Sequence, residues 1–280
     1  MNPADRRIFE RFASRVLHTS LLGVKRITDV FRKPATSIPR SPRTILLVKL
    51  WGLGALVCST PAMATIRQRY PEARITLITQ KGLDHIYDAT GLYDNVISWN
   101  AANLQEVPRA IRSLREEIRD QPPDIAICMD GLSSMSALIT QISGAKTTVG
   151  FVTHGGKSGG YTVAVPLDLG CHAIRSFLDL AKAADAPSED TELVPPSLLT
   201  SEREAARASL RQWGLDEHTL LIGLNMNAGE FARRRAWPAE KFLLLAQAIE
   251  EMGEYKTVFL AQLRRSALSR AMSNTWTLCR

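Results

Sequence analysis

Paired cysteines, long apolar runs and an excess of acidic residues are all missing from this sequence, and each absence excludes a class of protein. The four cysteines are scattered over 280 residues and form no CxxC pair or Cys/His cluster, which argues against a zinc site and a disulfide framework. No stretch of about 18 apolar residues could span a bilayer, and the charged segment after Met1 does not resemble a signal peptide. We therefore expect a cytoplasmic protein with no metal ion and no cofactor.

The basic excess of the chain is confined to its first segment. Residues 1–43 hold ten Lys and Arg against three Asp and Glu, which accounts for the whole formal charge of +7, and the rest of the chain holds 25 of each sign. Apolar residues recur at helical spacing between the basic residues of 1–33. Two interpretations remain open: an amphipathic helix that lies on an anionic membrane surface, or a helix that caps the following domain. The neutral body disfavours nucleic-acid binding.

Beyond a proline-containing linker at 34–42, short apolar runs alternate with helical segments. The predicted strands cover 44–50, 74–79, 95–99, 125–129, 147–151, 220–225 and 256–261. The predicted helices cover 61–69, 107–119, 134–142, 172–184, 201–213 and 238–252. This alternation is typical of doubly wound α/β domains. We expect an arm at 1–43, an α/β domain at 44–198 and a partial one at 199–280, whose two strands are too few for a parallel sheet covered on both faces.

A glycine-rich turn lies between the first predicted strand and the first predicted helix. It contains Lys49, Gly52 and Gly54, and glycines at this place let a ligand approach the backbone. A dinucleotide site is disfavoured because Val57 replaces the third glycine of GxGxxG and because Lys81, not an acid, follows the second strand. No GK[ST] sequence follows, which argues against a triphosphate-binding loop. A tight turn that only packs the helix on the sheet remains an alternative.

A second motif follows the strand at 220–225. Small and polar residues at 225–229 precede three arginines at 233–235 and the pair Trp237–Pro238. Ligands of open α/β sheets bind beyond the carboxyl ends of the strands, where backbone N–H groups and arginines suit a phosphate. Pro238 is expected at the first position of the next helix. A solvated basic loop is the alternative.

Candidates for acid–base chemistry are few. Asp130 ends the strand at 125–129, where catalytic residues of α/β proteins often lie, but we favour a helix cap or a hydrogen-bonded loop acid for it. His172 begins a predicted helix and fits a capping or surface residue, and His154 lies in a glycine-rich loop without a sequence partner. The sequence contains no Ser-His-Asp order, HExxH motif or pair of carboxylates at helical spacing.

Three segments, in order, resemble family 9 glycosyltransferases, the heptosyltransferases of lipopolysaccharide core synthesis. They are the strand–turn–helix–strand at 45–79, the strand, acid and small-residue helix at 122–151, and the strand, loop and Trp-Pro element at 222–249. The resemblance implies a GT-B-type architecture of two Rossmann-like doubly wound domains. It further implies that the first domain binds the acceptor and the second binds the nucleotide-sugar.

The same resemblance implies an inverting, metal-independent transfer of heptose or a similar sugar from an ADP-sugar to the core oligosaccharide on lipid A. Carried over by position, Asn227, Ala228 and Gly229 would meet the donor phosphates, and Arg235 would take the place of a phosphate-binding lysine. The glycine-rich turn would lie on the acceptor side. The basic arm would suit an acceptor held in the inner membrane.

Two departures from the family pattern bear on activity. The family's general base is an Asp directly after the glycine that corresponds to Gly54, and here that position is Ala55, which cannot accept a proton. The family's late Asp-Gly-His motif is absent, so we expect a C-terminally truncated chain whose second domain is incomplete. A non-catalytic homologue that binds the acceptor or the membrane is therefore the alternative to an active transferase. The general base stays unidentified.

Overall fold

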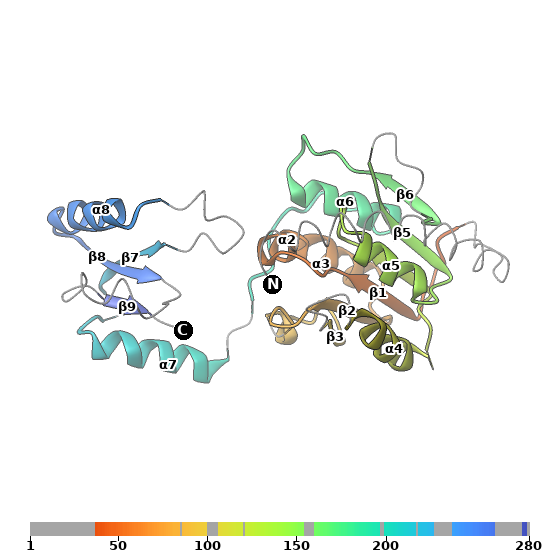
Figure 1. Cartoon of the computed structure of the whole chain (residues 1–280), viewed down its shortest axis with the longest axis horizontal. Coiled ribbons are helices and arrows are strands. Elements are labelled where there is room, and N and C mark those ends of the chain that lie inside the picture. The colour runs from red at the N-terminus through yellow and green to blue at the C-terminus, as the bar shows by residue number, and fades with distance from the viewer. Residues whose placement is uncertain are drawn as a thin grey trace. The chain divides into compact units, whose positions relative to one another are not determined.

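The computed structural model describes residues 37–84, 86–99, 106–119, 121–153, 160–196, 199–216, 218–226, 237–260 and 276–278. The chain forms two compact units, which divide between residues 197 and 198. Each unit is built on its own parallel sheet (Figure 1).

The larger unit contains a sheet of six parallel strands in the order β3-β2-β1-β4-β5-β6. Its strands are β1 (Thr44–Val48), β2 (Arg74–Gln80), β3 (Asn95–Trp99), β4 (Ile125–Cys128), β5 (Thr147–Val152) and β6 (Val163–Pro166). β1 lies in the middle, with Ile45 opposite Ile75 on one side and opposite Ile125 on the other. The chain therefore enters at the centre of the sheet, adds β2 and β3 outward, and then adds β4, β5 and β6 on the other side.

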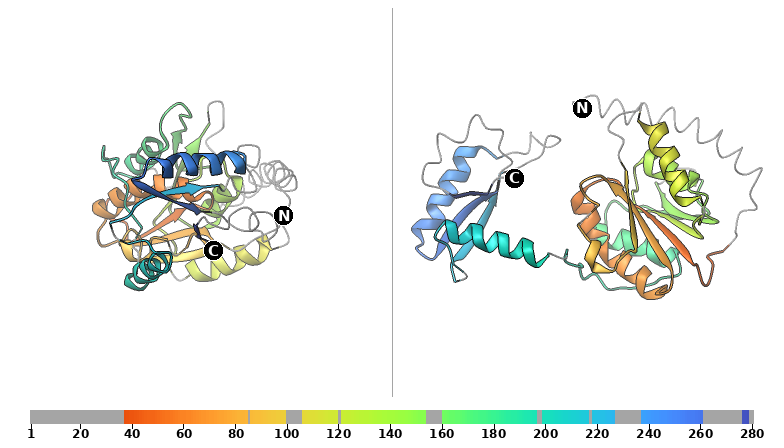
Figure 2. Two further views of the ribbon diagram at one scale, coloured as in Figure 1. Left: turned by 90° about the vertical axis from the view of Figure 1, so that its left-hand side faces the viewer. Right: turned by 90° about the horizontal axis from the view of Figure 1, so that it is seen from below.

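Helices cover both faces of this sheet (Figures 1 and 2). They are α2 (Leu53–Cys58), α3 (Thr60–Arg69), α4 (Val107–Ile118), α5 (Ser134–Ile142) and α6 (Ala173–Ala183), with a short 3-10 turn η1 (Asp88–Thr90). Because side chains alternate along β1, Ile45 and Leu47 join a core with α3 and α6, whereas Leu46 and Val48 join a second core with α4 and α5. All four are at most 2% exposed, which is the burial on both faces that the uninterrupted apolar run predicts.

The smaller unit contains three parallel strands in the order β7-β8-β9. Its elements are α7 (Thr200–Gln212), β7 (Leu220–Asn225), α8 (Ala239–Glu251), β8 (Tyr255–Leu260) and β9 (Trp276–Leu278). α8 packs on one face of this sheet, where Ala246 joins Leu224 and Phe259 in a small core. The two parallel sheets with their helices confirm the predicted α/β class.

Three elements, α2, β6 and β9, differ from the elements that the sequence predicts. α2 is a six-residue helix in the segment expected to be a turn, and it begins after Gly52, whose φ of 83° is a conformation that glycine adopts readily. β6 has only four residues and ends in proline, so its pattern is too short to distinguish from a loop. β9 is a third strand of the smaller sheet, where only two were expected, and has three residues.

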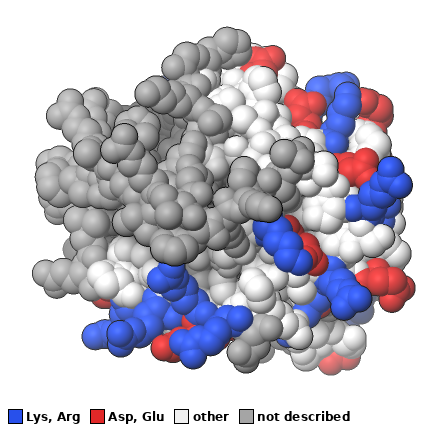
Figure 3. Space-filling model, turned by 90° about the vertical axis from the view of Figure 1, so that its right-hand side faces the viewer, with Lys and Arg blue, Asp and Glu red and all other residues white. Residues whose placement is uncertain are grey.

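The described surface mixes charges of both signs. Figure 3 shows basic and acidic side chains close to one another on one face of the molecule, in agreement with the charge balance beyond residue 43. On α4, for example, exposed Arg112 and Arg115 are followed by exposed Glu116 and Glu117. Each helix that the structure describes is too short or too polar to cross a membrane.

β7 is an edge strand of the described sheet, although its sequence is that of a central strand. The run Leu-Leu-Ile-Gly-Leu-Asn contains neither a charge nor a proline. Leu220 is nevertheless 54% exposed and Leu221 is 37% exposed. Natural edge strands are usually protected by charges, prolines or bulges, because an unprotected apolar edge pairs with other chains. We therefore expect this edge to promote self-association.

We predict that Leu221→Lys shifts the chain toward the monomer, because a charge at the edge opposes strand pairing between chains. Sedimentation velocity over a range of protein concentrations measures the effect. Met252→Lys is the matched control, since Met252 is 67% exposed and follows the end of α8. Equal self-association of wild type and both variants would contradict a role for the β7 edge.

Candidate functional site

Two loops meet at the carboxyl edge of the larger sheet, where the strand order reverses. β1 and β4 are neighbours, but the chain runs from β1 to one side of the sheet and from β4 to the other. In open α/β sheets such a switch point leaves a crevice in which ligands bind. Here the glycine-rich turn follows β1, and residues 129–133 connect β4 to α5. This edge is the candidate active site of the larger unit.

A buried ion pair joins the two loops. Lys49 Nζ lies 2.5 Å from Asp130 Oδ1, and the two side chains are 2% and 7% exposed. Asp130 Oδ2 accepts hydrogen bonds from Leu50 N and Ser136 Oγ, both at 2.7 Å. Lys49 Nζ also donates to the carbonyl of Trp51. Buried charges need such additional partners, because both ions lose their hydration. The pair therefore fixes the backbone of the turn relative to α5.

A neutral hydrogen bond forms a second link between the same loops. Trp51 Nε1 donates to Ser133 Oγ at 2.9 Å. Ser133 is also the N-cap of α5, because its hydroxyl accepts a hydrogen bond from Ser136 N at 3.1 Å. The half-buried indole of Trp51 thus lies between the turn and the first residues of α5.

The hydrogen bonds of Asp130 define what its carboxylate can do. Oδ1 accepts a hydrogen bond from the Lys49 ammonium, and Oδ2 accepts hydrogen bonds from a backbone N–H and a hydroxyl. A carboxylate with both oxygens occupied in this way is held in place and does not point at a substrate. The geometry favours the hydrogen-bonded loop acid over a general base at this position.

The glycines of the turn differ in what they permit. Gly52 is the N-cap of α2, and its carbonyl accepts a hydrogen bond from Leu56 N at 2.9 Å. A side chain at Gly54 would meet no atom within 4 Å, so the surface of the turn is open there. Ala55 is half-buried and its methyl group packs against the core on the α3 and α6 face. The turn presents an open backbone at Gly54 and no proton-accepting side chain at position 55.

Cys128 precedes the site but has the properties of a packing residue. Burial raises the pKa of its thiol to about 11, and its sulfur is hydrogen-bonded to Tyr161. Burial likewise raises the pKa of Tyr161 above its usual value. The Tyr161 ring lies against Gly150, where an added Cβ would be 2.3 Å from the ring. The sequence pattern did not identify this cluster, because its residues are 11 to 33 positions apart in the chain.

Most of the second predicted site lies outside the described residues. Asn227, Ala228, Gly229 and Arg235 fall within 227–236, and His154 falls within 154–159. In the part of the chain that the structure does describe, no group of three or more His, Cys, Asp or Glu side chains could hold a metal ion.

The residues that flank the second motif are described. Trp237 is 46% exposed, and its ring packs edge-on against Phe242 with 5.0 Å between the ring centroids. Pro238 is the N-cap of α8 and not its first residue, because its ψ of 139° is extended. In the larger unit, His172 caps α6, where its Nδ1 accepts a hydrogen bond from Ile174 N at 3.4 Å. His172 thus has the capping role that its place in the sequence suggested.

We predict that Lys49→Met and Asp130→Asn each lower the free energy of unfolding by about 3–5 kcal/mol, because each leaves one buried charge without its partner. The double variant should recover part of this loss, since no uncompensated charge remains. Urea unfolding of the four proteins measures the coupling. Lys146→Met breaks the ion pair with Asp124, in which Lys146 is 69% exposed, and should cost less than about 1 kcal/mol. Additive losses in the double variant would contradict the coupling.

A protein-family model matches this sequence, and solved structures match this fold. The sequence model described as Glycosyltransferase family 9 (heptosyltransferase) matches residues 111–275. A family 9 glycosyl transferase from Veillonella parvula is similar in structure, with a TM-score of 0.75 and 18% identity over 88% of this chain and 71% of that one. No curated protein sequence matches the chain.

Two heptosyltransferases from E. coli are also similar in structure. WaaC, with ADP-2-deoxy-2-fluoro heptose, has a TM-score of 0.61 and 15% identity over 84% of this chain and 76% of its own. ADP-heptose lps heptosyltransferase II has a TM-score of 0.57 and 18% identity over 85% of this chain and 72% of its own. At these identities the structures establish the shared GT-B fold, and the family match extends over more than half of the sequence. The chain belongs to glycosyltransferase family 9.

Proposed function

We propose that this chain transfers heptose or a similar sugar from an ADP-sugar to the core oligosaccharide of lipopolysaccharide, with inversion and without a metal ion. The family match over residues 111–275 is the observation that carries the proposal. In the reaction, an acceptor hydroxyl oxygen bonds to the anomeric carbon, the bond from that carbon to ADP breaks, and a base takes the hydroxyl proton. The two similar E. coli proteins are described as heptosyltransferases, one of them with an ADP-heptose analogue.

We propose that the two domains bind different substrates. The domain at 44–198 binds the acceptor, and the domain at 199–280 binds the nucleotide-sugar. Asn227, Ala228 and Gly229 follow the carboxyl end of β7, where backbone N–H groups suit the donor diphosphate. The guanidinium of Arg235 supplies the opposite charge for the same phosphates.

The glycine-rich turn is proposed as the acceptor-side loop. Gly52 gives the backbone its turn, and the open side of Gly54 leaves room for a sugar to approach the main chain. Lys49 contributes indirectly, because its ammonium is buried against Asp130 and holds the turn in place. These residues bind and orient the acceptor but do not supply the base.

A second candidate function is a non-catalytic homologue that binds the acceptor or the membrane. Ala55 favours it, because the family's Asp is replaced by a side chain that takes no proton. Asp130 does not fill the gap, since both of its oxygens are engaged. The base of an active form would have to come from another residue.

We further propose that the chain is cytoplasmic and peripheral on the inner face of the inner membrane. The basic residues and apolar stripe of 1–33 suit anionic lipid headgroups, and this arm would keep the enzyme beside a membrane-held acceptor. The neutral charge of the rest of the chain argues against a nucleic-acid partner.

ADP is expected to stabilise the chain against thermal unfolding. At a hundredfold excess over the dissociation constant, a ligand that binds only the native state adds about 2.7 kcal/mol. Arg235→Ala should remove most of the increase in melting temperature, because the phosphates lose their charged partner. Arg211→Ala, on the exposed surface of α7, should leave it unchanged. If ADP does not alter the melt of the folded wild-type chain, the proposed donor site is wrong.

Transfer itself separates the two candidate functions. Labelled ADP-heptose, incubated with the chain and lipid A–core acceptor, yields labelled acceptor only if the chain is catalytic. We expect Ala55→Asp to raise transfer by about 100-fold or more, because it places a proton acceptor where the family has one. An ADP-dependent melt without transfer by either protein would support the non-catalytic function. Transfer by wild type that Ala55→Asp leaves unchanged would show that another base operates.

A further inference from the structure

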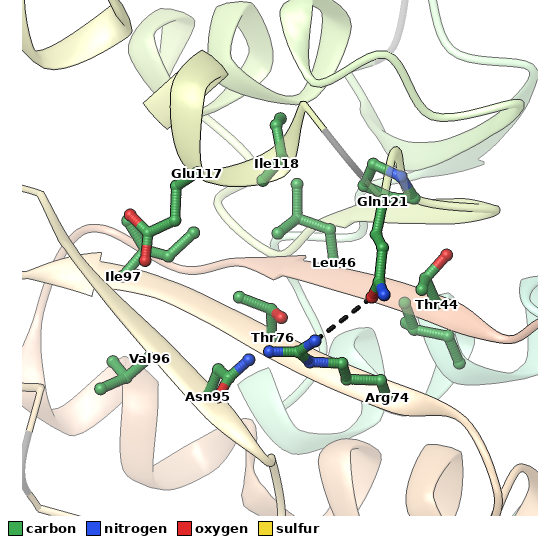
Figure 4. A pocket seen from close by; sticks show the side chains of 12 residues that line it. Thr44, Leu46, Arg74, Thr76, Asn95, Val96, Ile97, Glu117, Ile118 and Gln121 are labelled. Atoms are coloured by element: carbon green, nitrogen blue, oxygen red, sulfur yellow. Dashed lines mark hydrogen bonds between the residues drawn. The ribbon is translucent and has the colours of Figure 1, made fainter. Parts of the chain in front are cut away.

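A pocket of ≈ 440 Å³ opens at the amino ends of β1, β2 and β3, at the edge of the larger sheet opposite to the candidate active site (Figure 4). Its size lies within the range of small-molecule sites. The aliphatic part of its lining includes Leu46, Ile97 and Ile118. The polar part includes Arg74, Asn95, Glu117 and Gln121. No residue of the glycine-rich turn is among the residues that line the pocket.

The guanidinium of Arg74 is held in place by two neutral amides. Its Nη1 donates to Gln121 Oε1 at 3.2 Å. The Asn95 amide satisfies its neighbours when its oxygen faces Arg74, where it accepts from Nε at 2.9 Å and from Nη2 at 2.6 Å. An arginine has five N–H donors, so these three bonds leave two donors, one on each terminal nitrogen. The two remaining donors can bind oxygens of a carboxylate or phosphate.

Within the described chain, the charge of Arg74 has no ion-pair partner. Its side-chain hydrogen bonds go to neutral amide oxygens, and the carboxylate of Asp94, whose pKa Arg74 helps to lower, is itself ion-paired with Arg67 at 2.7 Å. Glu117 is exposed at the end of α4, and Figure 4 shows its carboxylate on the side of the pocket away from Gln121. No described ion pair includes Glu117. The pocket thus combines a fixed cation, a carboxylate that accepts hydrogen bonds, and amides that donate and accept.

We propose that this pocket binds a monosaccharide that carries a carboxylate or a phosphate. The anionic group pairs with the two remaining N–H donors of Arg74. Sugar hydroxyls donate to Glu117 and exchange hydrogen bonds with Asn95 and Gln121. The C–H face of the ring lies on the aliphatic lining near Ile97. A neutral sugar has no anionic group to pair with the guanidinium. A small inorganic anion has no hydroxyl groups for Glu117 and no C–H face for the aliphatic lining.

The binding experiment uses the full chain and two charged probes, glucuronate and glucose 1-phosphate. Glucose and inorganic phosphate are the matched controls, because each carries only one of the two features. Isothermal titration with ligand-observed NMR measures the affinities. We expect both charged sugars to bind at least tenfold more tightly than either control.

Variants place the binding in this pocket. Arg74→Gln should lower the affinity for both charged sugars at least tenfold. Arg74→Lys should restore only part of this affinity, because lysine keeps the charge but lacks the planar guanidinium. Glu117→Gln should lower the affinity for the charged sugars but leave the affinity for inorganic phosphate unchanged. Arg115→Gln, on the exposed part of α4, is the control and should change nothing. Circular dichroism confirms that each variant is folded.

Three results would overturn the proposal. Inorganic phosphate that binds as tightly as glucose 1-phosphate would reduce the pocket to an anion site. Charged sugars that do not bind, or that bind folded Arg74→Gln as well as wild type, would mean that the pocket is not their site. These outcomes are independent of the transferase proposal, because the test uses neither ADP nor transfer, and the pocket shares no residue with the proposed donor and acceptor sites.

Discussion

The geometry of the candidate active site depends on the buried ion pair between Lys49 and Asp130. Two charges that are almost wholly removed from water require hydrogen bonds from their surroundings, and the neighbouring backbone and hydroxyl groups provide three of them. Because these partners belong to the turn after β1 and to the first residues of α5, neither segment can move without breaking hydrogen bonds to a buried charge. The turn and the start of α5 are therefore positioned as one unit, with Trp51 bridging them through Ser133.

In the larger unit, the residues that fix the shape of the glycine-rich turn are not the same as the residue at position 55. The ion pair, the cap of α5 and the conformation of Gly52 fix the shape of the glycine-rich turn, whereas Ala55 offers no group that could accept a proton. Ala55 packs toward the core, and Asp130 takes its hydrogen bonds from Lys49 and from the backbone of Leu50. The shape of the turn therefore does not depend on the residue at position 55.

Sequence patterns predicted the elements whose apolar runs are long, and failed where the determining contact is tertiary. The strands at 95–99 and 220–225 and the helix at 134–142 have the predicted bounds, because each is a clear run between turn residues. β6 and β9 are too short to carry a period, and α2 follows a glycine turn that hides its start. Lys49 and Asp130 were both identified as candidates, but they are 81 residues apart, and no local pattern reveals that they form a pair. The pocket at the amino edge was missed for the same reason.

The position of β1 also has a consequence for the order of assembly. β1 precedes the other strands of its sheet in the chain and lies at the centre of that sheet, so β2 and β3 can be added to one of its sides while the chain is still growing. Its other side, together with the ammonium group of Lys49, must remain hydrated until β4 emerges 77 residues after the end of β1. The glycine-rich turn can therefore reach its final shape only after β4 and the start of α5 have left the ribosome, which makes its formation a late event in the assembly of the larger unit.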